Sequence, residues 1–305
     1  MTLARVDVAI PTRGRPAWCV EAVRSALAQE GVDVRVVVAL DGPQPDLAAA
    51  LRAVADPRLV VVERPPAGRS ATRNAAVAAT TAPLVAFLDD DDRLLPGALA
   101  ARAEALARFP QAVLVHGPAV ATDEDGAARR GGPRVPARAT ASDAACGDGL
   151  GPQLRGRSPV PSTVLLRREV FERVGGFPED LETGEDWLFF LRAAAVGAFV
   201  TLAAPTVLYR RHAGQVRGNP AMQERALAAW SGRFFDDPRT PPAVRARRDR
   251  VVARHLAWIA RNHRRAGDEA AFRRCFLTAV RLDPRLLLHP RRFARWVALR
   301  AGGRA

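Results

Sequence analysis

Four consecutive carboxylates follow one apolar run of the chain. The run is Leu84–Leu88, and Asp89, Asp90, Asp91 and Asp92 come directly after it. Four like charges at one point repel one another unless a positive group compensates them. A divalent cation is such a group, because Mg²⁺ binds one or two carboxylates together with the phosphate oxygens of a substrate. This cluster, called the acid run below, indicates metal-diphosphate chemistry, and its alternative is a solvated acidic turn or helix N-terminus.

Other polar residues also follow strand-like runs near the N-terminus. Pro11–Arg13 follow the apolar run Val6–Ile10, and Asp41 follows Val34–Leu40. Helix-like stretches separate these runs, which is the pattern of βαβ units with a mostly parallel sheet. Ligands of such sheets bind beyond the carboxyl ends of the strands. We therefore expect these residues and the acid run to meet in one crevice.

The remaining patterns extend the alternation of strands and helices. The predicted fold class is α/β, with a mostly parallel sheet covered by helices on both faces and a helical C-terminal extension. From residue 221 onward the pattern is helical, with a turn at 266–268. Further strands are expected at 59–62, 84–88, 113–120, 162–166 and 207–210, and helices at 17–30, 46–55, 70–79, 168–174 and 185–196.

One long segment shows neither pattern. Residues 126–161 are rich in Gly, Pro, Ala and Arg, which predicts a loop. Loops of this length in compact proteins tend to be lids or binding segments. We expect a mobile cover of the site there.

The charge of the chain is concentrated at its C-terminal end. The formal net charge is +14, but residues 1–220 carry 26 Arg against 25 acids, whereas residues 221–305 carry 20 Arg against 7 acids. Such asymmetry suggests a polyanionic partner, either an anionic membrane surface or nucleic acid. The chain has no Lys, so every positive side chain other than histidine is a guanidinium, which favours bidentate contacts with phosphate or carboxylate.

Cysteine use and hydropathy exclude several classes of protein. Cys19, Cys146 and Cys275 are odd in number and lack metal-ligand spacing, so neither a disulfide framework nor a zinc site is expected. No apolar run approaches the roughly 18–20 residues that span a bilayer, and the N-terminus has no signal-peptide pattern. We expect a cytoplasmic protein. A dehydrogenase is disfavoured, because no Gly-x-Gly-x-x-Gly follows the first strand.

The order and spacing of the motifs resemble the family 2 glycosyltransferases, which have the GT-A fold, use nucleotide sugars and invert the anomeric centre. The resemblance covers roughly residues 5–215. It implies a Rossmann-like GT-A domain over 1–220 and a basic helical region over 221–305. The blocks that carry it are 8–12, 40–42, 68–74, 87–92, 174–177, 184–187 and 209–212.

The resemblance implies a nucleotide-sugar site at the strand ends. By resemblance, Asp41 recognises the nucleobase. The alternative interpretation is that Asp41 only forms part of a simple Asp-Gly turn. Gly68 allows close backbone approach at a helix start, where a phosphate or ribose would bind. The residues expected to bind the donor are Pro11, Thr12, Arg13, Asp41, Gly68, Arg73, Asn74, Asp89 and Asp90.

Within the acid run, the family pattern Asp-x-Asp-Asp places Asp90 at the variable position. By resemblance Asp89 faces the ribose, and Asp91 binds a divalent cation, Mn²⁺ or Mg²⁺. Alternation along a strand would put Asp89 and Asp91 on one side, so Asp90 is expected to be replaceable and Asp92 to act as a support. His212 follows two arginines and completes the metal or diphosphate site in related enzymes, although an isolated histidine is more often structural.

The resemblance also implies a general base at the start of a later helix. Asp186 matches the family's base, which takes the proton of the acceptor hydroxyl. Glu185 would orient the acceptor or the sugar, and Trp187 would stack on a sugar ring or pack in the core. The alternative for the acids is a common acidic pair at a helix N-terminus, where the helix dipole favours negative charge.

The expected function is metal-dependent transfer of a sugar from a nucleoside-diphosphate sugar to a hydroxyl acceptor. The acceptor would be a saccharide, a lipid-linked compound or another hydroxyl in cell-surface polysaccharide, glycolipid or glycoconjugate synthesis. Residues 285–304 combine Arg with aromatic and aliphatic residues, as an amphipathic helix at the inner face of a membrane would. The alternative is a helix that packs its apolar side on the catalytic domain and leaves its arginines in solvent. The alternatives are a catalytically inactive nucleotide-sugar-binding or scaffold protein and, less consistent with the N-terminal motifs, a nucleic-acid-binding protein. No nucleic-acid partner is expected.

Overall fold

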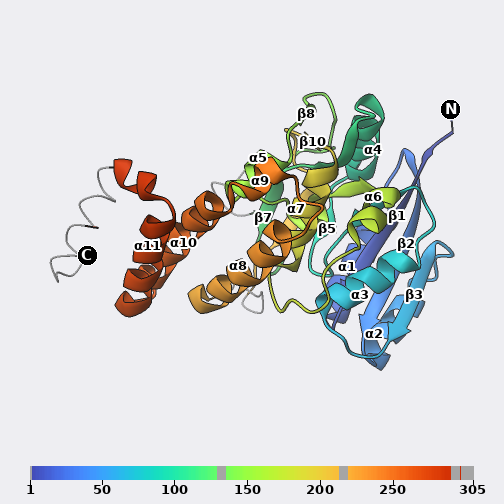
Figure 1. Cartoon of the computed structure of the whole chain (residues 1–305). Coiled ribbons are helices and arrows are strands. Elements are labelled where there is room, and N and C mark those ends of the chain that lie inside the picture. Colours follow the sequence, from blue (N-terminus) through green and yellow to red (C-terminus); the bar gives the residue numbers. More distant parts are fainter. Residues whose placement is uncertain (1, 129–134, 213–218, 290–295, 297–305) are drawn as a thin grey trace. The chain divides into compact units, whose positions relative to one another are not determined.

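A computed structural model of the chain describes residues 2–128, 135–212, 219–289 and 296 (Figure 1). Four strands near the N-terminus run parallel to one another: β1 (Ala4–Thr12), β2 (Val32–Asp41), β3 (Leu59–Arg64) and β4 (Leu84–Phe87). They form one half of an eight-stranded sheet with the order β3-β2-β1-β4-β9-β6-β10-β8. The predicted α/β fold with a mostly parallel sheet is confirmed.

The other half of the sheet contains shorter strands. These are β6 (Ala112–His116), β8 (Ala145–Gly147), β9 (Leu165–Arg167) and β10 (Ala198–Thr201). β10 is parallel to β6, whereas β9 is antiparallel to β4 and β6, and β8 is antiparallel to β10. A separate three-stranded sheet has the order β5 (Arg93–Leu94), β11 (Val207–Arg210) and β7 (Ala119–Thr122).

Helices cover both faces of the central strands. Val8 and Val36 share one core with apolar residues of α1 (Pro16–Leu27), α2 (Pro45–Arg52) and α4 (Ala98–Arg108). Ala9 and Val37, at the alternate positions, are equally buried. Because successive strand residues point to opposite faces, the second face is covered too, and α3 (Arg69–Ala78) packs there on β1 and β2. This layering explains the nearly continuous apolar runs of β1 and β2.

Two sequence predictions about this region were wrong in part. The strand expected at 113–120 is two strands, β6 and β7, which belong to different sheets. The loop expected at 126–161 contains β8 and the short helix α5 (Leu150–Leu154), and residues 129–134 lie outside the described part. A strand of three residues is too short to produce a period-2 pattern, and β8 forms only by pairing with the distant β10.

The helices expected at 168–174 and 185–196 are confirmed as α6 (Arg168–Val174) and α7 (Glu185–Val196). Gly175 ends α6 in the left-handed conformation, with φ of 80°. A residue with a Cβ rarely adopts that conformation, which explains the Gly175-Gly176 pair that follows the helix.

The described residues fall into two compact units. The first comprises Met1–Leu150, Ser158–Asp180 and Arg192–Gln215, and the second comprises Gly151–Arg157, Leu181–Leu191 and Val216–Ala305. The helices of the second unit after residue 215 are α8 (Pro220–Phe235), α9 (Pro242–Arg245), α10 (Arg248–Arg265) and α11 (Glu269–Leu282), followed by a 3₁₀ turn at Pro284–Leu288. The predicted division into a glycosyltransferase domain over 1–220 and a basic helical region over 221–305 remains a prediction.

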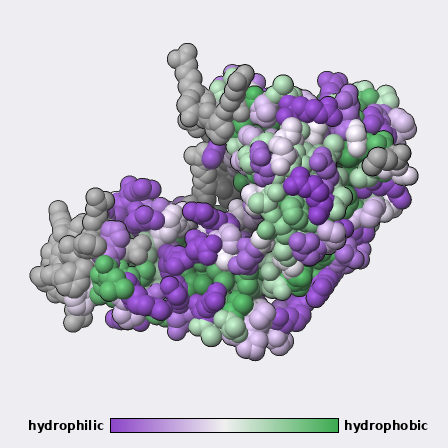
Figure 2. All heavy atoms as spheres, turned by 90° about the horizontal axis from the view of Figure 1, so that it is seen from above, coloured by the Kyte–Doolittle hydropathy of each residue, from purple (hydrophilic) through white to green (hydrophobic). Residues whose placement is uncertain are grey.

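The second unit is held by apolar and polar contacts among its helices. α10 packs against α8 and α11, and the predicted turn at 266–268 joins α10 to α11. On the face seen in Figure 2, hydrophilic residues cover much of this unit, with small hydrophobic patches between them. Within the described residues, none of the helices has the length and apolar character needed to cross a membrane. The amphipathic segment expected at 285–304 lies mostly outside the described residues.

A buried histidine in the first unit predicts a pH-dependent stability. Burial, helped by the Arg102 cation, lowers the pKa of His116 to about 4. The unfolded chain, with an ordinary histidine pKa near 6.5, binds more protons than the folded chain between pH 6.5 and 4, so stability falls as the pH is lowered through this window. We expect His116→Gln to remove about 2 kcal/mol of the stability difference between pH 7 and pH 5 measured by urea denaturation.

The matched control for this experiment is His289→Gln. His289 is exposed, so its replacement should leave the pH dependence of unfolding unchanged. An unaltered pH dependence in His116→Gln would contradict the assignment of the effect to His116.

Candidate functional site

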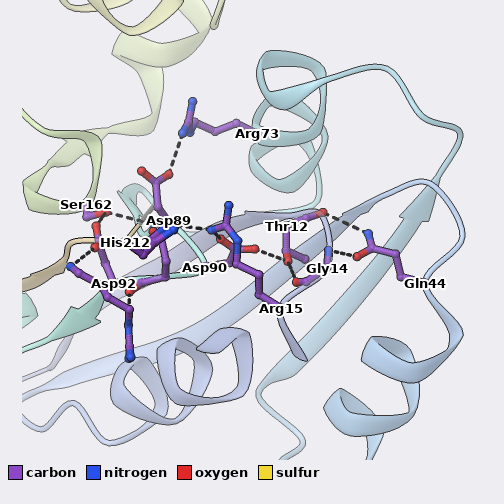
Figure 3. Close-up of polar contacts among 12 residues, drawn as sticks. Thr12, Gly14, Arg15, Gln44, Arg73, Asp89, Asp90, Asp92, Ser162 and His212 are labelled. Carbon is purple, nitrogen blue, oxygen red and sulfur yellow. Dashed lines mark hydrogen bonds and ion pairs between the residues drawn. The ribbon is translucent and has the colours of Figure 1, made fainter. Parts of the chain in front are cut away.

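The acid run lies in a turn directly after β4, at the carboxyl end of the central sheet (Figure 3). Because β4 ends at Phe87, the alternation of a strand does not extend through the four aspartates, and the argument that paired Asp89 with Asp91 on that basis was wrong. Each carboxylate instead has its own set of partners. These partners determine which aspartates are free to bind a ligand and which hold the fold.

Asp89 pairs with a buried arginine. Nη2 of Arg73 lies 2.8 Å from Oδ1 of Asp89, and Arg73 is only 1% exposed. The guanidinium of Arg73, which comes from α3, also lies 4.8 Å from the ring centroid of Phe177. The Asp89 side chain is 30% exposed, more than those of Asp90 and Asp91. It is therefore both fixed in direction and open to a ligand.

Asp90 is held inside the first unit. Thr12 Oγ1 donates to Asp90 Oδ2 at 2.6 Å, and Arg15 Nη1 donates to Oδ1 at 2.9 Å. Burial raises the pKa of Asp90 to about 6, and the carboxylates of Asp91 and Asp89 act in the same direction, whereas Thr12 and Arg15 oppose the shift. These contacts join Asp90 to the segment after β1, and the tolerance of Asp90 to replacement remains a prediction.

Asp91 receives two positive or polar groups at a single oxygen. Arg15 Nη1 lies 2.8 Å and His212 Nε2 lies 2.9 Å from Asp91 Oδ2. The His212 side chain is 4% exposed, and its ring packs on Trp18 with centroids 4.9 Å apart. The structure thus brings His212 and Asp91 together, and their joint binding of a metal remains a prediction. His212 comes from beyond β11, so the two sheets of the first unit meet at this carboxylate.

Asp92 is a fully buried support. Ser162 Oγ donates to Asp92 Oδ2 at 2.5 Å, and the Arg210 backbone N–H donates to Oδ1 at 3.1 Å. Burial, together with the charges of Asp89 and Asp91, raises its pKa well above the usual value. The same Ser162 oxygen accepts the Asp89 backbone N–H at 3.1 Å. Asp92 thus anchors the turn, in agreement with its expected supporting part.

The residues fit a divalent cation. One oxygen each from Asp89, Asp91 and Asp92 lie within 4.8 Å of one another. Hard cations such as Mg²⁺ prefer carboxylate oxygens, and both oxygens of Asp92 already accept hydrogen bonds. Asp89 and Asp91 are therefore the carboxylates suited to ligation, with His212 beside them. The Arg15 guanidinium supplies positive charge at the same point.

Asp41 lies at the carboxyl end of β2 and holds the loop before α3. Its Oδ1 accepts the backbone N–H groups of Ala67 at 2.8 Å and Gly68 at 3.1 Å. Burial opposes the ionised form, but these hydrogen bonds prevail and lower the pKa of Asp41. Gly68 has φ of 88° and directly precedes α3. Asp41 therefore fixes the loop in which Gly68 was expected to approach a donor.

The other predicted donor residues have different surroundings. Asn74 donates to the carbonyl of Phe177 and accepts its N–H, at 2.8 and 2.9 Å, so it positions the turn after α6. Pro11 and Thr12 are buried at the end of β1, whereas Arg13 is exposed. Arg13 makes no contact with the acid run among the described interactions, whereas Arg15 does, and the donor-binding part of Arg13 remains a prediction.

Arg15 and Gln44 were not predicted from the sequence to belong to this site. Arg15, which follows Gly14, has the left-handed conformation with φ of 59°. The next residue, Pro16, begins α1. Gln44 Nε2 donates to the Thr12 carbonyl at 3.2 Å, and its Oε1 accepts the Gly14 N–H. Ser162 and Arg210 enclose Asp92. A Gly-Arg-Pro sequence just before a helix is the one local signal that indicates such a turn.

The predicted base lies in the second unit. Asp186 and the buried Glu185 form the first turn of α7, and Asp186 Oδ1 accepts the Trp187 backbone N–H at 2.7 Å. Gly184, with φ of 81°, lets α8 approach this turn, because a Cβ there would lie 3.2 Å from Trp230 and 3.3 Å from Ala226. The carboxylates of this turn and the acid run belong to different units.

A second group of potential metal ligands lies among the C-terminal helices. Glu224, His263 and Cys275 have ligand atoms within 4.8 Å of one another. However, His263 Nε2 and Arg274 Nη2 already contact Glu224 Oε1, at 2.6 and 2.9 Å. Burial, with the nearby Glu224 carboxylate, raises the pKa of Cys275 to about 12, so its thiol stays protonated. We interpret this group as a cross-link between α8, α10 and α11.

Comparison with known proteins agrees with this fold. The family model described as glycosyl transferase family 2 matches residues 7–175, which is more than half of the chain. The chain therefore belongs to glycosyl transferase family 2 and is a glycosyltransferase. The resemblance drawn from the sequence motifs is confirmed at this level.

Curated relatives are similar over different shares of the chain. The succinoglycan biosynthesis protein ExoO of Rhizobium meliloti (strain 1021) is 31% identical over 194 residues, which is 58% of this chain and 52% of the relative. The chain thus matches about half the length of that protein. Uncharacterized protein MT1568 of Mycobacterium tuberculosis (strain CDC 1551 / Oshkosh) is 29% identical over 269 residues, covering 83% of this chain and 81% of that protein.

Solved structures support the fold. S. aureus TarS 1-349 in complex with UDP-GlcNAc has a TM-score of 0.65 and 16% identity, covering 92% of this chain and 83% of that one. The mannosyltransferase PcManGT from Pyrobaculum calidifontis in complex with GDP-Man and Mn²⁺ has a TM-score of 0.54 and 18% identity, covering 99% of this chain and 85% of that one. At these identities the likeness concerns the fold.

Proposed function

We propose that this glycosyltransferase moves a sugar from a nucleoside-diphosphate sugar to a hydroxyl acceptor, with a divalent cation and inversion at the anomeric carbon. The observation that carries the proposal is the close approach of Asp89, Asp91 and Asp92, with carboxylate oxygens within 4.8 Å of one another at the carboxyl end of β4. UDP-GlcNAc in one similar structure and GDP-Man with Mn²⁺ in another support a donor and a cation of these kinds.

The donor side of the reaction uses the first unit. Asp91 and His212 would hold Mn²⁺ or Mg²⁺, with Asp89 beside them, and the bound cation would stabilise the negative charge of the departing diphosphate as a Lewis acid. Arg73 directs Asp89 toward the ribose. Arg15 orients Asp90 and Asp91 through its two ion pairs. Asp41 keeps the Gly68 loop in place for the base and phosphates.

The acceptor side uses the first turn of α7. Asp186 takes the proton of the acceptor hydroxyl while that oxygen forms its bond to the anomeric carbon, and the bond from this carbon to the diphosphate oxygen breaks. A single displacement of this kind inverts the anomeric centre. Glu185 orients the acceptor or the sugar.

The acceptor class follows from the charge of the C-terminal part. With 20 Arg against 7 acids in residues 221–305, the protein is suited to an anionic surface or polymer. We propose a saccharide or lipid-linked acceptor in surface polysaccharide or glycoconjugate synthesis, with residues 285–304 as the contact to an anionic membrane. The succinoglycan biosynthesis protein among the relatives is consistent with this class.

The test is a panel of nucleoside-diphosphate sugars assayed with Mn²⁺, with Mg²⁺ and with a chelator. We expect release of the nucleoside diphosphate from one donor when either metal is present and none with the chelator. Turnover of every donor that is unchanged by the chelator would contradict the proposed site.

A further inference from the structure

A pocket in the second unit is assigned no part in the donor chemistry. Its volume is about 220 Å³, which suits a monosaccharide-sized group. Arg155, Trp187, Arg254, His255, Trp258 and Arg261 line it. All of these residues belong to the second unit, and Trp187 directly follows the predicted base Asp186. The pocket therefore begins at the turn that carries the acceptor chemistry.

The pocket is cationic. Arg254, Trp258 and Arg261 are spaced by four and three residues along α10, so they lie on one face of that helix. Arg155 lines the pocket from the segment after α5. Within the described part of the chain, none of these three guanidinium groups is paired with a carboxylate. Three uncompensated guanidiniums at one pocket attract an anion and suit phosphate or carboxylate oxygens.

The pocket also offers aromatic surface. The Trp187 ring stacks on Trp230 with centroids 6.0 Å apart, and both rings contact the edge or face of His255 at 5.3 Å. Trp258 is 45% exposed, which is unusual for so large an apolar side chain. Flat aromatic faces at a polar pocket suit the apolar face of a sugar ring.

Two buried polar atoms beside the pocket lack a partner among the described residues. They are Trp187 Nε1, which is a donor, and His255 Nε2. Because His255 Nδ1 lies 2.9 Å from the Val251 carbonyl oxygen, Nδ1 carries the hydrogen and Nε2 is the acceptor. Burial, opposed by the Val251 hydrogen bond and helped by Arg254, lowers the pKa of His255, which keeps this ring neutral. Both atoms are almost fully shielded from solvent, so the contribution of these two side chains to the pocket is aromatic surface.

From these observations we infer that the pocket binds an anionic saccharide, a sugar bearing a phosphate or carboxylate, as part of the acceptor. The sugar ring lies on Trp187 and Trp258, and the anionic group meets Arg155, Arg254 and Arg261. This inference rests on the proposed function, since it names the acceptor of that reaction.

The test measures binding to the full chain by tryptophan fluorescence, with glucose 6-phosphate, glucuronic acid, glucose and inorganic phosphate as probes. We expect one or both anionic sugars to bind at least about tenfold more tightly than glucose or phosphate alone, because each charge-assisted contact adds to the ring contact. The two anionic probes distinguish phosphate from carboxylate. Equal affinities for glucose and the anionic sugars, or for inorganic phosphate and glucose 6-phosphate, would overturn the inference.

Variants of α10 locate the binding site. Arg254→Gln with Arg261→Gln should weaken the binding of the anionic sugar about tenfold or more, whereas Arg250→Gln with Arg265→Gln, exposed positions on the same helix, should leave it unchanged. Trp187→Phe, which replaces the indole by a smaller ring and so removes part of the aromatic surface, should also weaken it. Equal losses in both arginine pairs would indicate attraction to net charge and would overturn the inference.

Nucleotide binding separates this inference from the proposed function. Each sample is also titrated with nucleoside diphosphates in the presence of Mn²⁺. If the chain binds no anionic sugar but keeps Mn²⁺-dependent nucleotide binding, only the assignment of the pocket is overturned. If the chain binds the anionic sugar but shows no Mn²⁺-dependent nucleotide binding, the proposed donor site is overturned instead.

Discussion

Replacing Asp186 by Asn is expected to lower the turnover of the nucleotide sugar by about 10²–10⁴-fold, the contribution of a general base. The amide has the size of the carboxylate but cannot take the acceptor proton. Because Asp186 belongs to the second unit and the acid run to the first, donor binding should persist in this variant. The measurement is the rate of nucleoside diphosphate release with saturating donor, together with a binding titration of the donor.

The matched control is Asp249→Asn. Asp249 occupies the first turn of α10 and is exposed, so it has the same relation to a helix dipole without a part in the site. Its replacement should leave turnover unchanged. Full activity in Asp186→Asn would contradict the assignment of the base and would favour a base elsewhere in the chain.

Replacing Asp91 by Asn should remove the metal dependence of donor binding. Asp91 Oδ2 lies beside His212 and Arg15, and an amide there cannot neutralise a divalent cation. Because a cation at a diphosphate contributes several kcal/mol, we expect about 10²-fold weaker binding of nucleoside diphosphate in the presence of Mn²⁺. Calorimetry with Mn²⁺ and with a chelator measures this difference.

Asp125→Asn is the control for this experiment, because Asp125 is an exposed acid. It should bind the nucleotide as the original chain does. If Asp91→Asn kept its affinity and still responded to Mn²⁺, the cation would have to bind through other residues, and the assignment of Asp91 would be wrong.

Much of the fold could be predicted because the decisive signals are local. The runs that became β1 and β2 are apolar over their whole length, as expected of parallel strands buried on both faces. The helix starts at Pro16 and Pro45 are likewise marked in the sequence. The motifs of the family then placed the acid run and Asp186 in the correct elements.

The partners of the acid run could not be predicted because they come from distant segments. Ser162 and Arg210 reach Asp92 across 70 and 118 residues, and no local pattern marks either contact. The prediction that strand alternation places Asp89 and Asp91 on one side was wrong for a different reason, because β4 ends two residues before Asp89. The contacts of Arg15 with the acid run could not be predicted either, because they depend on a turn in which Gly14 and Arg15 both have positive φ.

The central claim is that the acid run holds the metal and donor while Asp186 serves the chemical step. Calorimetric titration of Asp91→Asn and Asp186→Asn with a nucleoside diphosphate and Mn²⁺ tests it most directly. The account predicts that Asp91→Asn loses Mn²⁺-dependent binding and that Asp186→Asn retains it. Equal Mn²⁺-dependent binding in both variants, or binding by the original chain that a chelator does not weaken, would contradict the account.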